Sequence, residues 1–247
     1  MKSSPQQILD NWNQLNAIIE KTFSGSQKQN IMYMLETFQD RIVEAPASSR
    51  PNYHNCWVGG FLDHTLRVVN TALEMKNQFY LLGVEVTSSN ADIVLAAMFH
   101  DFGKLGDLNH PYYIQQTDEW RRNKLNEWYT FNDKLEPMSV TDRALWLMQH
   151  FNIQVNMEVW KAIKMSDGLF DDGNTSLYKR PDTNRNILHY IIHFADWMST
   201  IAEKQHYMQS LEESTPISDQ VINKDKKVSD TTNVTDLKQK FDTLFND

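Results

Sequence analysis

The chain has 247 residues, of which 40% are apolar, and a formal net charge of −8 with a pI near 5.5. This length and composition predict a packed globular protein with one sizeable core or two small ones. The acidic balance disfavours non-specific binding to nucleic-acid backbones, and a single cysteine excludes an intramolecular disulfide. No stretch approaches the ~18 apolar residues of a membrane span, and the N-terminal residues lack the apolar run of a signal peptide. We therefore expect a cytoplasmic protein.

Helical spacing of apolar residues dominates the chain and strand-type alternation is nearly absent, so we predict an all-α fold. The segments with helical spacing are residues 5–22, 26–43, 59–82, 90–101, 119–131, 139–151, 156–166 and 183–211. Residues 45–55 carry two prolines and are expected to form a loop. Residues 103–118 are expected to be irregular, and residues 167–176 (DGLFDDGNTS) to form turns.

The composition changes after residue 211. Residues 212–233 have few large apolar side chains and many charges and hydroxyls, which predicts a flexible linker. A short amphipathic helix is then expected at the end of the chain. We predict an N-terminal helical hairpin at 1–49 that packs on the core, a main domain at 50–211, and a linker with a C-terminal docking helix at 212–247.

Histidines and carboxylates occur inside apolar helices, where an isolated charge is costly. His64 lies in GGFLDHTLRVV, and His100 and Asp101 end the apolar run of AMFHDFGKLGD. In ILHYIIHFADWM, His193 and Asp196 lie one helical turn apart. A divalent cation would satisfy all of these groups at once.

The order His64, His100-Asp101, Asp196 resembles the H…HD…D signature of the HD-domain metal-dependent phosphohydrolases, and HDFGK is similar to that family's HD-x-G-K. The resemblance covers about residues 50–205 and implies an HD-domain helical bundle, with 50–211 as its catalytic domain. It also implies that these four residues bind one divalent transition-metal ion (Mn, Co, Ni, Fe or Zn).

Two further segments, MSVTDRALWLMQHFNI and AIKMSDGLFDDGN, are similar to uncharacterised HD hydrolases of large tailed phages and bacteria. A histidine often precedes the Asp-Gly pair in those relatives, whereas Ser166 stands at this position here. A second metal ion is therefore not expected. If the chain is phage-encoded, the expected location is the host cytoplasm.

The resemblance implies hydrolysis of a phosphate ester, with a small phosphorylated substrate, above all a nucleotide (a nucleotidase or dNTPase type of activity). Asp101, a ligand beside the attacking water, is expected to help deprotonate it. Lys104 follows three residues later, and in this family that lysine faces the phosphates of the substrate. The alternative for Lys104 is a solvated position in a loop.

Other residues are candidates for binding the substrate. His150 and His193 are expected to line the pocket, although His150 also suits a core position bonded to the backbone. Tyr112 precedes the basic pair Arg121 and Arg122, and such residues can stack on a base and clamp phosphates. The alternative for the two arginines is a solvated helix face that pairs with neighbouring glutamates.

The last residues, QKFDTLFND, resemble the C-terminal peptides by which phage and bacterial replication proteins dock on the sliding clamp. Phe241, Leu244 and Phe245 would be the apolar anchors of such a peptide, presented on a flexible tether. The alternative is that this helix packs back on the body of the protein.

Three other functions compete with a phosphohydrolase. The segment YHNCWVGGFLDHTLRV also resembles the opening of the HD module in some bacterial 3′–5′ exoribonucleases, which suggests a single-strand nuclease, but the acidic balance disfavours it. A non-catalytic, metal-stabilised protein that docks on a replication partner is the second. The third is the oxygenase branch of HD proteins, whose di-iron centre needs more histidines than this set supplies.

Overall fold

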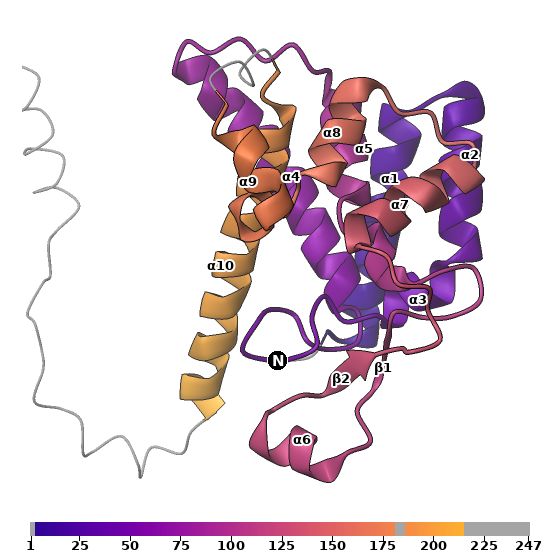
Figure 1. Ribbon diagram of the computed structural model, residues 1–247, viewed down its shortest axis with the longest axis vertical. Coiled ribbons are helices and arrows are strands. Elements are labelled where there is room, and N and C mark those ends of the chain that lie inside the picture. The colour runs from indigo at the N-terminus through magenta and orange to yellow at the C-terminus, as the bar shows by residue number, and fades with distance from the viewer. Residues whose placement is uncertain (1–2, 181–185, 215–247) are drawn as a thin grey trace, which may run out of the picture. The chain divides into compact units, whose positions relative to one another are not determined.

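The computed structural model describes residues 3–180 and 186–214 and confirms the all-α fold (Figure 1). The α-helices in these ranges are α1 (Pro5–Thr22), α2 (Gly25–Thr37), α3 (Gln39–Glu44), α4 (Gly60–Leu81), α5 (Asn90–Phe99), α6 (Glu119–Lys124), α7 (Val140–His150), α8 (Met157–Lys164), α9 (Asp172–Tyr178) and α10 (Leu188–Ser214). The 3-10 turns are η1 (Phe102–Leu105) and η2 (Gly168–Phe170), and the strands are β1 (Tyr113–Gln115) and β2 (Tyr129–Phe131). Within the described ranges, no helix combines the length and the apolar character that a membrane crossing requires.

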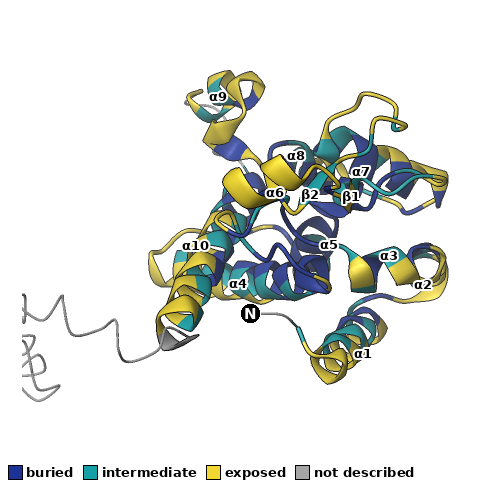
Figure 2. Ribbon diagram, turned by 90° about the horizontal axis from the view of Figure 1, so that it is seen from below, coloured by how far each residue is buried: buried dark blue, intermediate teal, exposed yellow. Residues whose placement is uncertain are grey.

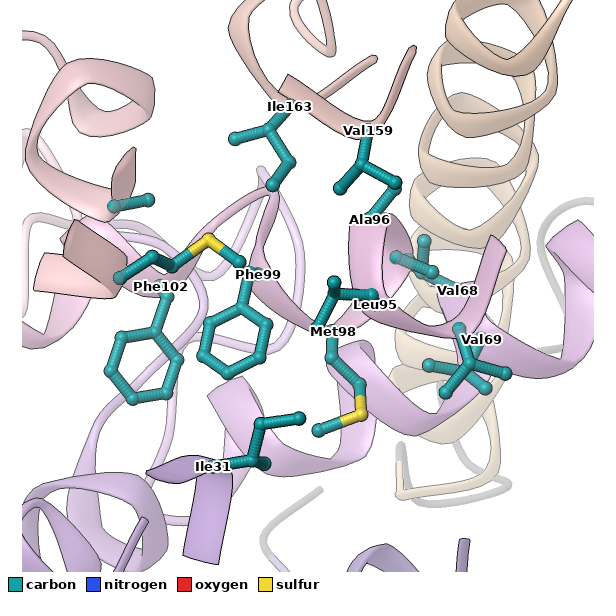
Figure 3. Packing of buried hydrophobic residues seen from close by; sticks show 14 of the residues in the cluster. Ile31, Val68, Val69, Leu95, Ala96, Met98, Phe99, Phe102, Val159 and Ile163 are labelled. Carbon is teal, nitrogen blue, oxygen red and sulfur yellow. The ribbon is translucent and has the colours of Figure 1, made fainter. Parts of the chain in front are cut away.

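Helix α5 lies at the centre of the hydrophobic core. Its sequence is apolar on every side, and a helix of that kind is stable only where every side is covered. It packs against α1, α4 and α8. Figure 3 shows its side chains between Val68 and Val69 of α4 and Val159 of α8. Ser89 and Asp92 form a capping box that begins the helix, and His100 directly follows its last residue.

The predicted hairpin at 1–49 shares this core and does not have one of its own. Leu15 and Ile19 of α1 and Ile31 of α2 belong to the same buried cluster as α5. Figure 2 shows these helices with their outer faces exposed and α5 buried. The described residues up to Gln209 form one compact unit.

Helix α10 lies beside α4, although more than a hundred residues separate them (Figure 2). The Ser199 hydroxyl lies 3.4 Å from the hydroxyl of Thr71 on α4, and one face of α10 is buried through Ile192 and Ala195. This packing brings polar residues of α10 next to the first turns of α4.

Several predicted boundaries need correction. The helix predicted at 26–43 is divided into α2 and α3 at Phe38, whose buried ring packs edge-on against Phe102 and Phe151. The helix predicted at 119–131 ends at Lys124, because Asn126 has a left-handed backbone (φ 51°). The last three residues of the predicted helix, Tyr129–Phe131, instead form β2, which pairs with β1 in the register Tyr113 to Phe131.

The segment predicted as turns, residues 167–176, forms η2 and most of α9. The long helix predicted at 183–211 begins at Leu188 and continues to Ser214, so residues 212–214 of the predicted linker are helical. The rest of the linker and the predicted docking residues Phe241, Leu244 and Phe245 lie outside the described residues.

Candidate metal centre

Two helices present imidazoles to the same buried place. His64 lies in the second turn of α4 and is fully buried, and His100 directly follows α5 and is 1% exposed. Nδ1 of His100 donates a hydrogen bond to the carbonyl of Ala97, at 2.8 Å. That bond places the hydrogen of the neutral ring on Nδ1, so Nε2 keeps a free lone pair.

Asp101 and Asp196 complete the set with one carboxylate each. Nε2 of His64 lies 3.7 Å from Oδ2 of Asp101 and 3.2 Å from Oδ1 of Asp196. For Nε2 of His100 the corresponding distances are 3.6 Å and 3.8 Å. The four residues that the sequence predicts as ligands therefore converge from α4, from the end of α5 and from α10.

These ligand atoms fit a divalent ion. Nε2 of His64 and Nε2 of His100 are both buried and make no hydrogen bond with any described residue. What sets these two nitrogens apart is that both lie within 4 Å of the same two carboxylates, so one cation among them would satisfy all four groups. An ion about 2.1 Å from each ligand would place neighbouring ligand atoms roughly 3.0–3.5 Å apart, close to the separations seen here. His64, His100 and Asp101 already meet the spacing of a cation-binding group.

Lys104 is placed beside this set by η1. Its Nζ lies 2.5 Å from Oδ2 of Asp101, and its side chain is 18% exposed. In η1, Gly103 is needed for close approach, because a Cβ there would lie 2.0 Å from the carbonyl oxygen of Val140 on α7. The helix predicted at 90–101 already ends at Phe99, and Gly103 lets η1 pack on α7.

The charges of the centre perturb its pKa values strongly. Burial alone would lower the pKa of His64, but the carboxylates of Glu203 and Asp196 raise it to about 10. Burial alone would raise the pKa of Asp101 and of Asp196. The Lys104 ammonium outweighs burial for Asp101, and the His64 imidazole does so for Asp196, so the pKa of each carboxyl lies below its ordinary value. Both carboxylates are thus ionised, as metal ligands must be.

Glu203 is a functional candidate that the sequence reasoning missed. It lies on α10 two turns after Asp196 and is 3% exposed. Its carboxylate accepts from Nδ1 of His64, at 3.1 Å from Oε2. Burial would raise the pKa of Glu203, but His64 and His54 lower it to about 2. The available signal was its spacing of seven residues from Asp196, which places both carboxylates on one face of a helix.

A pocket of about 400 Å³ opens beside Lys104 and is lined by Tyr112 and Tyr113. Tyr112, predicted to contact the substrate, therefore lies on the same wall as Lys104. The guanidinium of Arg143 lies 5.3 Å from the centre of the Tyr112 ring and also bonds to backbone carbonyls. Arg143 thus links the Tyr112 ring to the backbone of the neighbouring segment.

The other predicted substrate-binding residues lie elsewhere. His150 is exposed at the end of α7 and stacks on Trp146, because its spacing of four residues from Trp146 places both on the outer face of the helix. That position corrects the expected place in the pocket. Arg121, on the exposed helix α6, pairs with Glu127 at 3.3 Å, and Arg122 is also exposed, as in the alternative reading of a solvated face.

His193 is buried and supports the turn that contains Ser166. Its Nδ1 donates to the carbonyl of Ser166 at 3.0 Å, and its ring fills the space where a Cβ on Gly168 would lie. Asp167 lies between Ser166 and Gly168, and its pKa is raised because the surrounding protein limits hydration of its carboxyl group and because Asp101 and Asp196 are negatively charged. His193 therefore acts through this turn and is not part of the ligand set.

Comparison with protein-family models, with curated proteins and with solved structures finds no match.

Proposed function

We propose that the protein is a metal-dependent phosphohydrolase of the HD type that hydrolyses a phosphate ester, with a nucleotide as the preferred substrate. One observation carries the proposal. Two buried imidazole nitrogens without hydrogen bonds face two ionised carboxylates, contributed by three separate segments. Two carboxylates and two imidazoles gathered in one buried place need a cation to balance their charge and fill their lone pairs, and a bound divalent ion accounts for all four groups.

His64, His100, Asp101 and Asp196 would hold one divalent transition-metal ion. When bound, such an ion lowers the pKa of water and stabilises negative charge on a phosphate oxygen. In the family that the chain resembles, a histidine before the Asp-Gly pair is the expected ligand of a second ion, and Ser166 stands at that position here. We therefore propose a centre with one ion.

The chain's own residues supply the remaining functions. The Lys104 ammonium, whose pKa is raised because Asp101 outweighs the effect of burial, stays charged and suits a phosphate oxygen of the substrate. Its contact with Asp101 also keeps that carboxylate ionised, and only an ionised carboxylate can accept a proton from water. The tyrosine-lined pocket beside Lys104 would take the organic part of the ester.

The test is a screen of nucleotides and simple phosphate esters with Mn²⁺, Co²⁺, Ni²⁺, Fe²⁺ and Zn²⁺. We expect metal-stimulated release of phosphate, pyrophosphate or triphosphate, and a loss of at least about 100-fold in the His100→Ala variant, because a ligand is removed. His206→Ala is the matched control, since His206 is an exposed histidine on α10 outside the ligand set.

A metal-loaded protein that cleaves none of these esters would contradict the proposal. Stepwise shortening of a labelled single-stranded oligonucleotide by the same preparation would favour the nuclease. Metal binding with neither activity would favour the non-catalytic binding protein.

A further inference from the structure

A hydrogen-bond network centred on the buried Glu203 lies on the side of the His64 ring away from the ligand set. At its centre, the Glu203 carboxylate receives three nitrogen donors from separate side chains. Nδ1 of His54 lies 2.9 Å from Oε2, Nε of Arg67 lies 3.1 Å from Oε1, and Nδ1 of His64 lies 3.1–3.2 Å from both oxygens. Of these three donors, only His64 is one of the four predicted metal ligands.

We propose that Glu203 is a positioning residue of the metal centre, which holds His64 so that Nε2 faces the ion, while His54 and Arg67 hold Glu203 in place. This inference rests on the metal centre of the proposed function. Glu203 would contact neither the ion nor the substrate, but it would change the affinity of the centre for metal.

The reasoning follows from the hydrogen-bonding capacity of each group. An ionised carboxylate can only accept, so the hydrogen between Glu203 and His64 must lie on Nδ1 of the imidazole. With an ion bound in place of a proton on Nε2, the His64 ring is neutral and keeps its hydrogen on Nδ1, while Nε2 lies 3.2 Å from Asp196 and 3.7 Å from Asp101. A partner of this kind also fixes the plane of the ring and makes Nε2 a stronger donor to a metal.

The two histidine ligands are therefore fixed by different means. The backbone carbonyl of Ala97 accepts from His100 at a distance of only three residues, so the end of α5 suffices to orient that ring. His64 lies in the interior of α4, where backbone carbonyls are already engaged in the helix. Its orientation consequently depends on a side chain from α10.

A second cation site is the competing interpretation, because ligand atoms of His54, His64 and Glu203 lie within 4.8 Å of one another. Arg67 argues against it, since its guanidinium occupies Oε1 of Glu203 and would repel an added cation. An ion there would also have to displace the hydrogen from Nδ1 of His64. The network is therefore suited to orienting a ligand and not to binding an ion.

The test compares Mn²⁺ and Zn²⁺ binding, measured by calorimetry, in the unsubstituted full chain and in Glu203→Ala and Glu203→Gln. We expect one ion per chain and an affinity about 10–100-fold weaker in Glu203→Ala. Glu203→Gln should lose less, because its amide oxygen can still accept from Nδ1. Asp63→Asn is the matched control, because Asp63 also pairs with Arg67, at 3.5 Å, but does not bond to His64.

Unchanged affinity in Glu203→Ala would overturn the inference and leave the metal centre intact. Two ions bound per unsubstituted chain, with one lost in both Glu203 variants, would also overturn it in favour of a second site. No bound ion in the unsubstituted chain would instead overturn the proposed function, and this inference with it.

If Glu203→Ala does not fold, the ¹⁵N spectrum of the Zn²⁺-loaded unsubstituted protein decides the question. We expect His64 to coordinate through Nε2 with the hydrogen retained on Nδ1. Coordination through Nδ1 would overturn the inference.

Discussion

At Gly103, the backbone of η1 passes so close to α7 that a side chain has no room. The Cβ of Gly103→Ala would lie 2.0 Å from the carbonyl oxygen of Val140 and 2.8 Å from its carbonyl carbon. Ordinary contact begins near 3.4 Å, so the two backbones would have to separate by about 1.4 Å. The opposing atom belongs to a helix backbone and cannot rotate away as a side chain would.

Overpacking of this kind costs about 1–3 kcal/mol in general, and we expect the upper end here. For a chain of this size, ~3 kcal/mol corresponds to a fall in Tm of about 6–12 °C. Because Gly103 lies between Asp101 and Lys104, the same displacement should weaken metal binding. Thermal unfolding of Gly103→Ala therefore measures the loss of stability, and Mn²⁺ titration measures the loss of metal affinity, that the clash with Val140 is expected to cause.

Gly173→Ala is the matched control, because its Cβ would meet only the Asp171 side chain, at 3.2 Å, in helix α9. We expect a change in stability within about 1 kcal/mol, with alanine favoured by its helix propensity. If Gly103→Ala had the Tm and the metal affinity of the unsubstituted protein, the reasoning on η1 and α7 would be refuted.

Three further predictions concern the metal, pH and helix α5. The protein loaded at an ion concentration near 100 Kd should have a Tm about 5–10 °C higher than the protein treated with a chelator, because the ion binds only the folded state. An equal effect of the chelator on His100→Ala would contradict the ligand assignment. Burial, and after it the charge of Lys161, lowers the pKa of His189 to about 4 in the folded protein. In the unfolded chain this pKa has its ordinary value near 6.5, so the unfolded chain binds more protons between pH 4 and pH 6.5. The free energy of unfolding therefore decreases as the pH falls from 6.5 to 4. His189→Leu should remove up to about 3 kcal/mol of that fall in urea titrations at pH 7 and pH 4, and parallel pH profiles would refute the prediction. Ser89→Ala should lower the free energy of unfolding by about 1 kcal/mol through loss of the capping box; an unshifted urea midpoint would count against it.

Local features of the sequence predict much of the fold because they depend on neighbours in the chain. The apolar spacing predicts α1 and α7 nearly to the residue, and the uniformly apolar run of α5 predicts a buried helix that ends beside His100. Spacing fails where tertiary contacts override it. Phe38 interrupts a helix to reach the core, and residues 129–131 pair as a strand although their spacing suits a helix.

The same division applies to the candidate centre. The sequence by itself determined the helical class and the adjacency of His100 and Asp101. Through the family resemblance, it also predicted His64 and Asp196 as the other two ligands. Only the tertiary structure decided that Glu203 holds His64 from behind, that Lys104 contacts Asp101, and that His150 faces away. The physical reason is that residue spacing fixes which side of a helix a group lies on. What that side meets depends on how α4 and α10, far apart in the chain, pack together.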